Sequence, residues 1–167
     1  MTDPHTSPPP WSSRPFGPAD LAAVLALFEE PDFHYRTDQP DTRSTAEIVA
    51  LLGDDTRVLL AGGRVVGLYA LSPDGAEHGG GFLLTLRLSR AVPESWWAAA
   101  YAEVELAGHW HHEIVRLSTR FASHDARGLR VARRLPLVEE GVLAEVTARD
   151  GDRFGQVFFA RVWSPAG

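Results

Sequence analysis

The sequence predicts a single mixed α/β (α+β) domain with a mostly antiparallel sheet of six or seven strands and about four helices. First, the chain has 167 residues, of which 44% are hydrophobic and 23% charged, as is typical of one globular domain. Second, two leucine-rich and β-branched runs at 57–61 and 64–72 enclose Gly62-Gly63, which indicates a hairpin. Third, segments with helical spacing of apolar residues alternate with further strand-like runs.

The N-terminal segment differs in composition from the rest of the chain. Residues 1–13 contain four prolines and several small polar residues, so we expect an extended or disordered tail there. We expect one domain over 14–163 and a short tail over 164–167. The first tail has no signal-peptide pattern, and the chain has no apolar run long enough to span a membrane. We therefore expect a cytoplasmic protein with no membrane partner.

Two helices are predicted before the hairpin. The first covers 21–30, because its apolar residues recur at helical spacing. The second begins at Thr45, which can cap its N-terminus, and ends before Gly53. A long connection that contains aromatic residues separates the two helices.

After the hairpin, the pattern alternates between strands and helices. The predicted elements are a strand at 82–89, a helix from 96 that ends near Gly108, a strand at 113–119, a helix at 126–135 capped by Asp125, and strands at 141–148 and 155–163.

Composition excludes several classes of function. The chain has no cysteine, which excludes disulfides, thiolate zinc sites and cysteine nucleophiles. All 16 basic residues are arginine, so neither a Schiff-base lysine nor a P-loop lysine is available. The net charge of −6 argues against general attraction to nucleic acid, and we expect no nucleic-acid partner.

Two segments resemble the GNAT superfamily of N-acyltransferases. The hairpin at 58–71 is similar to the second and third strands of that fold, and 125–143 is similar to its late helix-to-strand segment. The ribosomal-protein acetyltransferase branch often has an Asn-x-x-Ser-hydrophobic-Arg phrase there, followed by Gly-Phe and Glu-Gly-hydrophobic-Leu. The corresponding residues here are Asp125, Gly128, Leu129, Arg130, Pro136, Leu137, Glu140, Gly141, Val142 and Leu143. The resemblance runs from about Arg14 to Trp163.

This resemblance implies a fold whose two central strands splay apart to admit the pantetheine arm of acyl-CoA. The implied activity is transfer of an acyl group, typically acetyl, from acetyl-CoA or another acyl-CoA to a primary amine of a small molecule or peptide. The candidate site residues are His34, Tyr35 and Glu103 for catalysis, Leu86, Arg87, Leu88, Arg90, Ser95, Arg127 and Arg130 for the cofactor, and Arg36, Trp96 and Arg116 for the substrate.

The sequence departs from the family pattern where the pyrophosphate of CoA would bind. The family has a glycine-rich loop whose backbone N–H groups hold the phosphates. Here the segment from Leu88 to Trp96 has no glycine, and it contains Pro93 and Glu94. Gly128 and Ala132 also stand where some members have a serine or tyrosine general acid. The alternative is therefore a GNAT-fold protein that has lost the usual CoA site and is a biosynthetic enzyme of another reaction type or a small-ligand-binding protein.

Arginines form two further candidate anion sites. A patch on the late helix and the preceding strand could bind CoA phosphates or another anion, or could be a solvated face paired with nearby glutamates. The patch comprises Arg120, Arg127, Arg130, Arg133 and Arg134, and the glutamates are Glu139, Glu140 and Glu145. If Arg87 and Arg116 lie side by side on the splayed strands, they would form a fork for a carboxylate.

Histidines and aromatic residues offer weaker signals. His109, His111 and His112 lack the spacing of helical metal ligands, so we expect no metal. Trp97 and Tyr101 are explained by core packing, so only an exposed Trp96 would indicate a ligand cavity. The sequence leaves a possible homodimer open.

Overall fold

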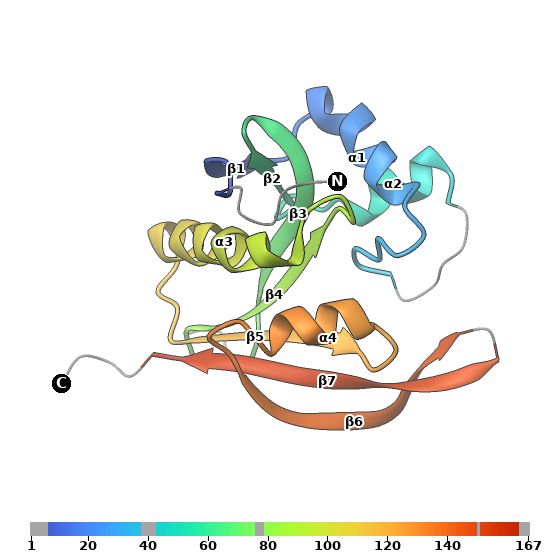
Figure 1. Ribbon diagram of the computed structural model, residues 1–167, viewed down its shortest axis with the longest axis vertical. Coiled ribbons are helices and arrows are strands. Elements are labelled where there is room, and N and C mark those ends of the chain that lie inside the picture. Colours follow the sequence, from blue (N-terminus) through green and yellow to red (C-terminus); the bar gives the residue numbers. More distant parts are fainter. Residues whose placement is uncertain (1–6, 38–42, 76–78, 150, 164–167) are drawn as a thin grey trace.

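The computed structural model describes residues 7–37, 43–75, 79–149 and 151–163, without the side chains of 147 and 149. One seven-stranded sheet has the order β1-β2-β3-β4-β5-β7-β6 (Figure 1). The strands are β1 (Trp11–Pro15), β2 (Arg57–Ala61), β3 (Arg64–Pro73), β4 (Gly81–Leu88), β5 (Arg116–Ala122), β6 (Val138–Arg149) and β7 (Asp152–Val162). Only the β4–β5 pair is parallel among the described strands. The mixed, mostly antiparallel sheet that the sequence predicts is confirmed.

Four α-helices connect these strands, as the sequence predicts for the described residues. They are α1 (Leu21–Phe28), α2 (Thr45–Leu51), α3 (Trp97–His111) and α4 (Ala126–Ala132), with 3₁₀ turns at Pro18–Asp20 and Glu94–Trp96. The predicted cap of α4 is confirmed, since the Asp125 carboxylate accepts a hydrogen bond from the Gly128 N–H at 2.7 Å.

Three local predictions differ from the structure. Strand β1 begins at Trp11, inside the expected tail, because it pairs with β2 and its Trp11 packs against the core. Ser44 rather than Thr45 caps α2, because Ser44 and Glu47 form a reciprocal capping box. Helix α3 continues past Gly108 to His111. Gly108 lacks a side chain because a Cβ there would lie 2.9 Å from two apolar side chains.

The helices cover both faces of the sheet. Leu86 and Leu88 of β4 belong to one apolar core together with Trp97 and Tyr101 of α3 and residues of α4. Helix α1 belongs to a second core with Val58 of β2 and its neighbours. Because successive strand residues point to opposite faces, these two cores lie on opposite sides of the sheet.

The two central strands separate after a short paired segment. Strands β4 and β5 pair at only three positions, from Gly81 opposite Arg116 to Leu83 opposite Ser118. The last link is the Thr119 hydroxyl, which donates to the Leu84 carbonyl at 3.0 Å. Beyond it, β4 pairs only with β3 and β5 only with β7, and the strands diverge (Figure 1). The predicted splay is therefore present.

Candidate functional site

A hollow lies beside the diverging ends of β4 and β5, on the face of the sheet away from α3 and α4. It consists of two adjoining cavities of about 60 and 310 Å³. The two cavities share four lining residues, which are His34, Thr37, Arg87 and Arg120. We call this hollow, defined by these four residues, the cleft.

Strand alternation positions the two arginines of the cleft. On β4, Leu86 and Leu88 are buried in the α3 core, so Arg87 between them points to the opposite face. On β5, Phe121 packs toward α4, so the neighbouring Arg120 also points away from the helix. Two strands that separate therefore deliver two guanidinium groups to one cavity.

Arg87 is held in place by backbone carbonyls. Its Nε donates to the His34 carbonyl at 3.1 Å, and its Nη1 donates to the Leu86 carbonyl at 2.7 Å. Its guanidinium carbon also lies 5.4 Å from the centre of the Phe121 ring, a cation–π contact. Arg87 thus ties the connection between α1 and α2 to the sheet and fixes its charge at the cleft wall.

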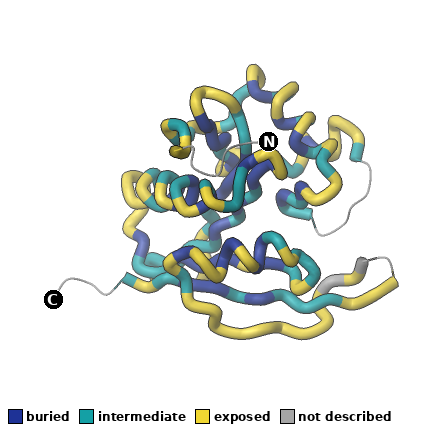
Figure 2. The backbone as a smooth tube through the Cα atoms, viewed as in Figure 1, coloured by how far each residue is buried: buried dark blue, intermediate teal, exposed yellow. Residues whose placement is uncertain are grey.

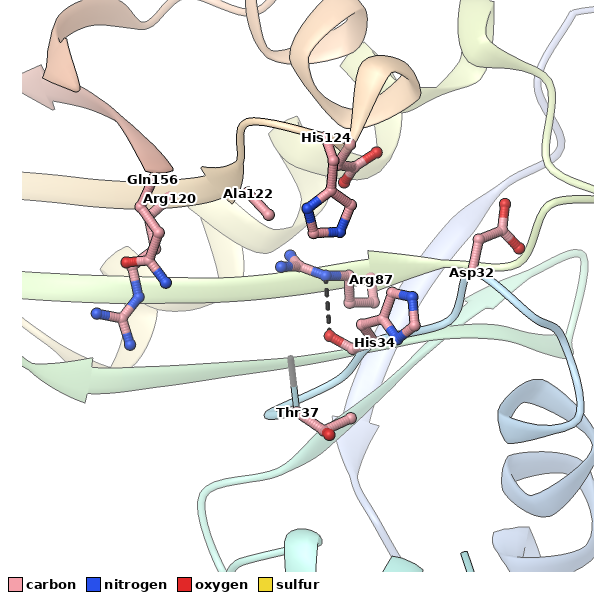
Figure 3. Close-up of a pocket in the computed structure, with 9 residues that line it drawn as sticks. Asp32, His34, Thr37, Arg87, Arg120, Ala122, His124 and Gln156 are labelled. Carbon is pink, nitrogen blue, oxygen red and sulfur yellow. Dashed lines mark hydrogen bonds between the residues drawn. The ribbon is translucent and has the colours of Figure 1, made fainter. Parts of the chain in front are cut away.

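Arg120 is the exposed counterpart of Arg87. It is exposed, and within the described ranges its side chain has no hydrogen bond or ion pair. Figure 3 shows His34, Arg87 and His124 gathered together, with Arg120 and Gln156 farther along β5 and β7. The Nδ1 atom of His124 is buried and has no hydrogen-bond partner among the residues described. Arg120 is therefore the cationic group of the cleft that the described residues leave open to a ligand.

The larger cavity is cationic. Its charged lining residues are Arg36, Arg87 and Arg120, with His34 beside them, and no acidic residue of the described chain lines it. Arg36 is paired outside the cavity with Asp55. The hydroxyls of Thr37, Ser72 and Thr85 add neutral hydrogen-bonding groups. The smaller cavity also has Asp32 and Asp125 at its wall. The arrangement suits an anion at the end of the cleft nearest Arg36.

The structure separates the three residues predicted for catalysis. His34 lies in the cleft. Tyr35, its neighbour, is fully buried and shares a 2.9 Å hydrogen bond with Thr56, and this burial raises the pKa of its hydroxyl. Glu103 lies on α3, where it accepts a 3.4 Å hydrogen bond from Ser13 of β1. Glu103 therefore lines a different hollow from His34.

The predicted fork of Arg87 and Arg116 is wrong. The parallel register places Arg116 opposite Gly81, six residues before Arg87 on β4. At about 3.3 Å per residue, the two arginines are roughly 20 Å apart along the sheet. Arg116 instead pairs with Glu140 of β6. Arg120, four residues farther along β5, reaches the cleft in its place.

The loop from Ser89 to Trp96 does not form a phosphate cradle. Four consecutive N–H groups are already bonded to the protein's own acceptors, and Pro93 has none to offer. These bonds run from Ser89 to the Val66 carbonyl, from Arg90 to the Glu30 carboxylate, from Ala91 to the Ser89 hydroxyl and from Val92 to the Ser89 carbonyl. The Glu30 carboxylate also accepts from the Ser89 hydroxyl at 2.6 Å. An anion would find a carboxylate where it needs N–H donors.

The arginines predicted for the cofactor bind this loop instead. Arg127 of α4 donates to the Val92 carbonyl at 2.7 Å and lies 5.5 Å from the Trp97 ring centre. Arg130 pairs with Glu94 at 2.5 Å, and this hydrogen bond holds the pKa of the Glu94 carboxyl below its usual value. These contacts close the loop onto α4. The residues present therefore do not fit the pyrophosphate of CoA in the way that the resemblance implies.

The remaining predicted residues occupy ordinary structural positions. Leu86 and Leu88 are buried core residues, Arg90 and Ser95 are exposed in the loop, and Trp96 packs half-buried against the core. Trp97 and Tyr101 are core residues, as expected. The arginine patch is paired on α4, with Arg133 bound to Glu139 and Arg134 near Glu94. Arg120 lies apart from this patch, on β5.

The histidine run packs against aromatic rings. His109 lies 4.9 Å from the Trp163 ring and His112 lies 4.7 Å from the Phe82 ring. Within the described residues, no group of three or more histidine or acidic side chains could hold a metal ion. No helix in the described part of the chain is long and apolar enough to cross a membrane.

The fold, with its splayed strands and late helix, is that of the GNAT N-acetyltransferases. A ribosomal-protein-alanine N-acetyltransferase from Brucella melitensis is similar over 90% of this chain and 99% of its own, with a TM-score of 0.71 and 18% identity. A GNAT-family acetyltransferase from Bacillus anthracis gives a TM-score of 0.73 and 13% identity, with 93% and 96% of the two chains covered.

A third solved structure, a ribosomal L7/L12 α-N-protein acetyltransferase in complex with coenzyme A, is also similar. Its TM-score is 0.74 at 13% identity, and 95% of this chain and 96% of that chain are covered. No protein-family model matches the chain, and no curated protein matches its sequence. At these identities the similarity establishes the fold, while the function depends on the site.

Proposed function

We propose that this protein uses the GNAT fold to bind a small anionic molecule in the cleft, without acyl-CoA bound through the usual pyrophosphate loop. The observation that carries the proposal is the loop itself, whose N–H groups from Ser89 to Val92 are already bonded within the protein. A ligand phosphate would have to displace the Glu30 carboxylate and the Arg127 contact together.

The cleft supports an anion for three reasons. Arg87 is preorganised by two backbone carbonyls, so its charge is held at the wall before a ligand arrives. Arg120 is exposed and can close over a carboxylate or phosphate with two parallel hydrogen bonds. The cavity of about 310 Å³ suits a small metabolite.

Ligand titration tests this proposal. We expect small di- and tricarboxylates or phosphate monoesters to stabilise the protein in a thermal-shift screen, and calorimetry to give their affinities. A ligand at about 100 times its Kd adds about 2.7 kcal/mol to the free energy of unfolding. Arg120→Gln should weaken binding about tenfold or more, since a charge-assisted hydrogen bond is lost. Arg64→Gln, an exposed arginine in the β2–β3 hairpin, is the matched control.

The same screen includes acetyl-CoA and CoA. We expect neither compound to raise the melting temperature by more than contact of its phosphates with Arg120 would. Micromolar binding of acetyl-CoA that is unchanged in Arg120→Gln would overturn the proposal, because it would require a working phosphate site elsewhere.

Acyl transfer to a primary amine of a small molecule or peptide is the second candidate. The splay of β4 and β5 favours it, because solved acetyltransferases have the same fold. The arginines of the cleft would then favour an amine substrate that also carries an acid group. Mass spectrometry of amino acids and acidic peptides incubated with acetyl-CoA tests this activity, with His34→Ala as the variant and His109→Ala as the control.

A cytoplasmic location belongs to the same proposal. A chain without cysteine is compatible with a reducing compartment.

A further inference from the structure

A second hollow lies on the opposite face of the sheet from the cleft, between β1–β3 and the second half of α3. It consists of two adjoining cavities of about 270 and 340 Å³ that share Arg57, Ala107 and His111. We call it the α3 groove, defined by these three residues together with Glu103 and Trp110. The α3 groove and the cleft have no lining residue in common among the described residues.

A chain of hydrogen bonds across the α3 groove fixes two opposite charges. Arg57 Nε donates to the Tyr69 hydroxyl at 2.9 Å, and Tyr69 donates to Ser13 Oγ at 3.0 Å. Ser13 in turn donates to the Glu103 carboxylate at 3.4 Å. These three consecutive bonds set an upper limit of about 9.3 Å on the distance between Arg57 Nε and Glu103 Oε1. Both hydroxyl groups therefore donate in the direction of the Glu103 carboxylate.

The guanidinium is oriented for a ligand. Its Nε is occupied by Tyr69, which is buried, while Arg57 lines both cavities of the groove. Within the residues described, its two terminal nitrogens have no hydrogen-bond partner. Paired donors in a fixed plane match a carboxylate.

Helix α3 adds an apolar wall beside these charges. Glu103, Leu106 and Trp110 recur at positions i, i+3 and i+7, so they share one helix face. Leu106 is 58% exposed and Trp110 is 78% exposed, and both line the groove. Large side chains exposed together on a helix indicate a binding surface.

We propose that the α3 groove binds a free α-amino acid with an apolar side chain. The carboxylate would bind Arg57, the ammonium group would bind Glu103, and the side chain would lie on Leu106 and Trp110. Two charge-assisted hydrogen bonds of about 2.8 Å and the roughly 3 Å between the ammonium and carboxylate groups of an amino acid together come close to that upper limit, so one amino acid can reach both charges.

The surrounding charges favour a zwitterion over a simple anion. Asp54 and Asp55 stand at one end of the groove, and Glu103 stands at the other. Asp55 is bound by Arg36, and Asp54 is exposed. The two carboxylates that Arg36 does not bind, those of Asp54 and Glu103, would repel a ligand that carried only negative charge and would attract an ammonium group.

Calorimetric titration with L-phenylalanine and L-leucine tests the proposal. We expect both to bind, and N-acetyl-L-phenylalanine and L-phenylalaninamide to bind about tenfold or more weakly, because each lacks one of the two charges. Glycine should bind more weakly than L-leucine, because it lacks the side chain that Trp110 contacts.

Variants at the surface of the groove give the second half of the test. Trp110→Ala and Glu103→Gln should each weaken L-phenylalanine about tenfold, while His109→Ala, Glu113→Gln and the cleft variant Arg120→Gln leave it unchanged. Melting curves establish that each variant is folded. The proposal is overturned if neither L-phenylalanine nor L-leucine binds, or if L-phenylalanine binds both groove variants as it binds the parent. Either result leaves the cleft proposal untouched.

Discussion

At the scale of single residues, the pair of Arg14 and Asp20 anchors the first strand to the first helix. Two hydrogen bonds of 2.6 Å join the guanidinium to the carboxylate, which is 4% exposed. The Arg14 bond holds the pKa of the Asp20 carboxyl below its ordinary value. The Asp20 carboxyl therefore takes up its proton at a higher pH in the unfolded chain than in the folded protein. The stabilisation by this pair is complete above the ordinary pKa of the carboxyl and is lost as the pH falls through the lowered pKa of the folded protein.

Asp20→Asn tests this pair. We expect the substitution to reduce the free energy of unfolding by about 1–3 kcal/mol near pH 7, because charge-assisted hydrogen bonds to a buried group are lost. The difference from the parent should shrink below about pH 4, where the parent's carboxyl also becomes protonated. Urea unfolding across pH measures both effects, with the exposed Asp152→Asn as control. A pH-independent difference would contradict the prediction.

Gly128 provides a second test at this scale. It lies inside α4, where alanine would ordinarily favour the helix. A Cβ there would lie 2.3 Å from the Asp125 carboxylate and 2.6 Å from the Phe121 ring. We therefore expect Gly128→Ala to lower stability by about 1–3 kcal/mol through overpacking. Gly141→Ala, where a Cβ meets nothing within 4 Å, is the control and should be near neutral in the same urea experiment.

Individual side chains were predictable where local chemistry decides them. The Asp125 cap depends only on the residues that follow it, so the sequence identifies it. The sequence pattern predicts Thr45 as the cap of α2, whereas the structure has Ser44 there, because Ser44 makes the reciprocal contact with Glu47. The sequence places Arg120 with the arginines of α4 because the predicted strand ends at residue 119, whereas β5 continues to Ala122.

At the scale of elements, the register of β5 decides what the cleft contains. Arg116 and Arg120 lie on the same face of one strand, four residues apart. The parallel pairing of Arg116 with Gly81 decides which of the two reaches the splayed end. Register between strands distant in sequence is a tertiary property, so the choice between the two arginines needed the structure.

The contact between the Ser89–Trp96 loop and α4 is a second property at this scale. Glu94 pairs with Arg130 and lies 3.8 Å from Arg134. We expect Glu94→Gln to loosen the loop, because two ionic contacts from α4 are lost together. Hydrogen exchange measured by NMR should then be faster at the Val92 and Trp96 amides than in the parent. Glu113→Gln is the control, and unchanged exchange in Glu94→Gln would contradict this role of the contact.

At the scale of the whole molecule, the sheet ends in an exposed edge at β6 (Figure 2). Val138, Val142, Leu143 and Val146 of this strand are all exposed. Unpaired strand edges with apolar side chains favour association. We therefore predict that the protein self-associates through β6, which fits the homodimer considered from the sequence.

Sedimentation velocity tests this association. Val142→Lys should shift the protein toward the monomer at concentrations where the parent is associated, because a charge on the edge opposes strand pairing. Val49→Lys, also an exposed valine but on α2, should have no such effect. If both variants sediment as the parent does, the edge is not the association surface.

Most of the fold was predictable from sequence because its signals are local. The Gly62-Gly63 hairpin and the apolar periodicity of α1 and α3 each arise within a short segment. Strand β1 was missed because its five residues follow a proline-rich stretch and gain their order from pairing with β2. The sequence did not indicate the α3 groove, because Arg57 and Glu103 are far apart in sequence and are connected by hydrogen bonds through Tyr69 and Ser13.

The Glu30 contact limits how this loop could be changed to bind a phosphate. Glycine at Ala91, Pro93, Glu94 or Ser95 would leave the Glu30 carboxylate, which follows α1, bound to Ser89 and Arg90, and would leave Arg127 on the Val92 carbonyl. Substitutions at Glu30, in the loop and at Arg127 would have to occur together, and a substitution at Glu30 or Arg127 alone would remove a stabilising contact without creating a site. In a laboratory evolution experiment, no single substitution in this loop should therefore produce binding of a nucleotide cofactor.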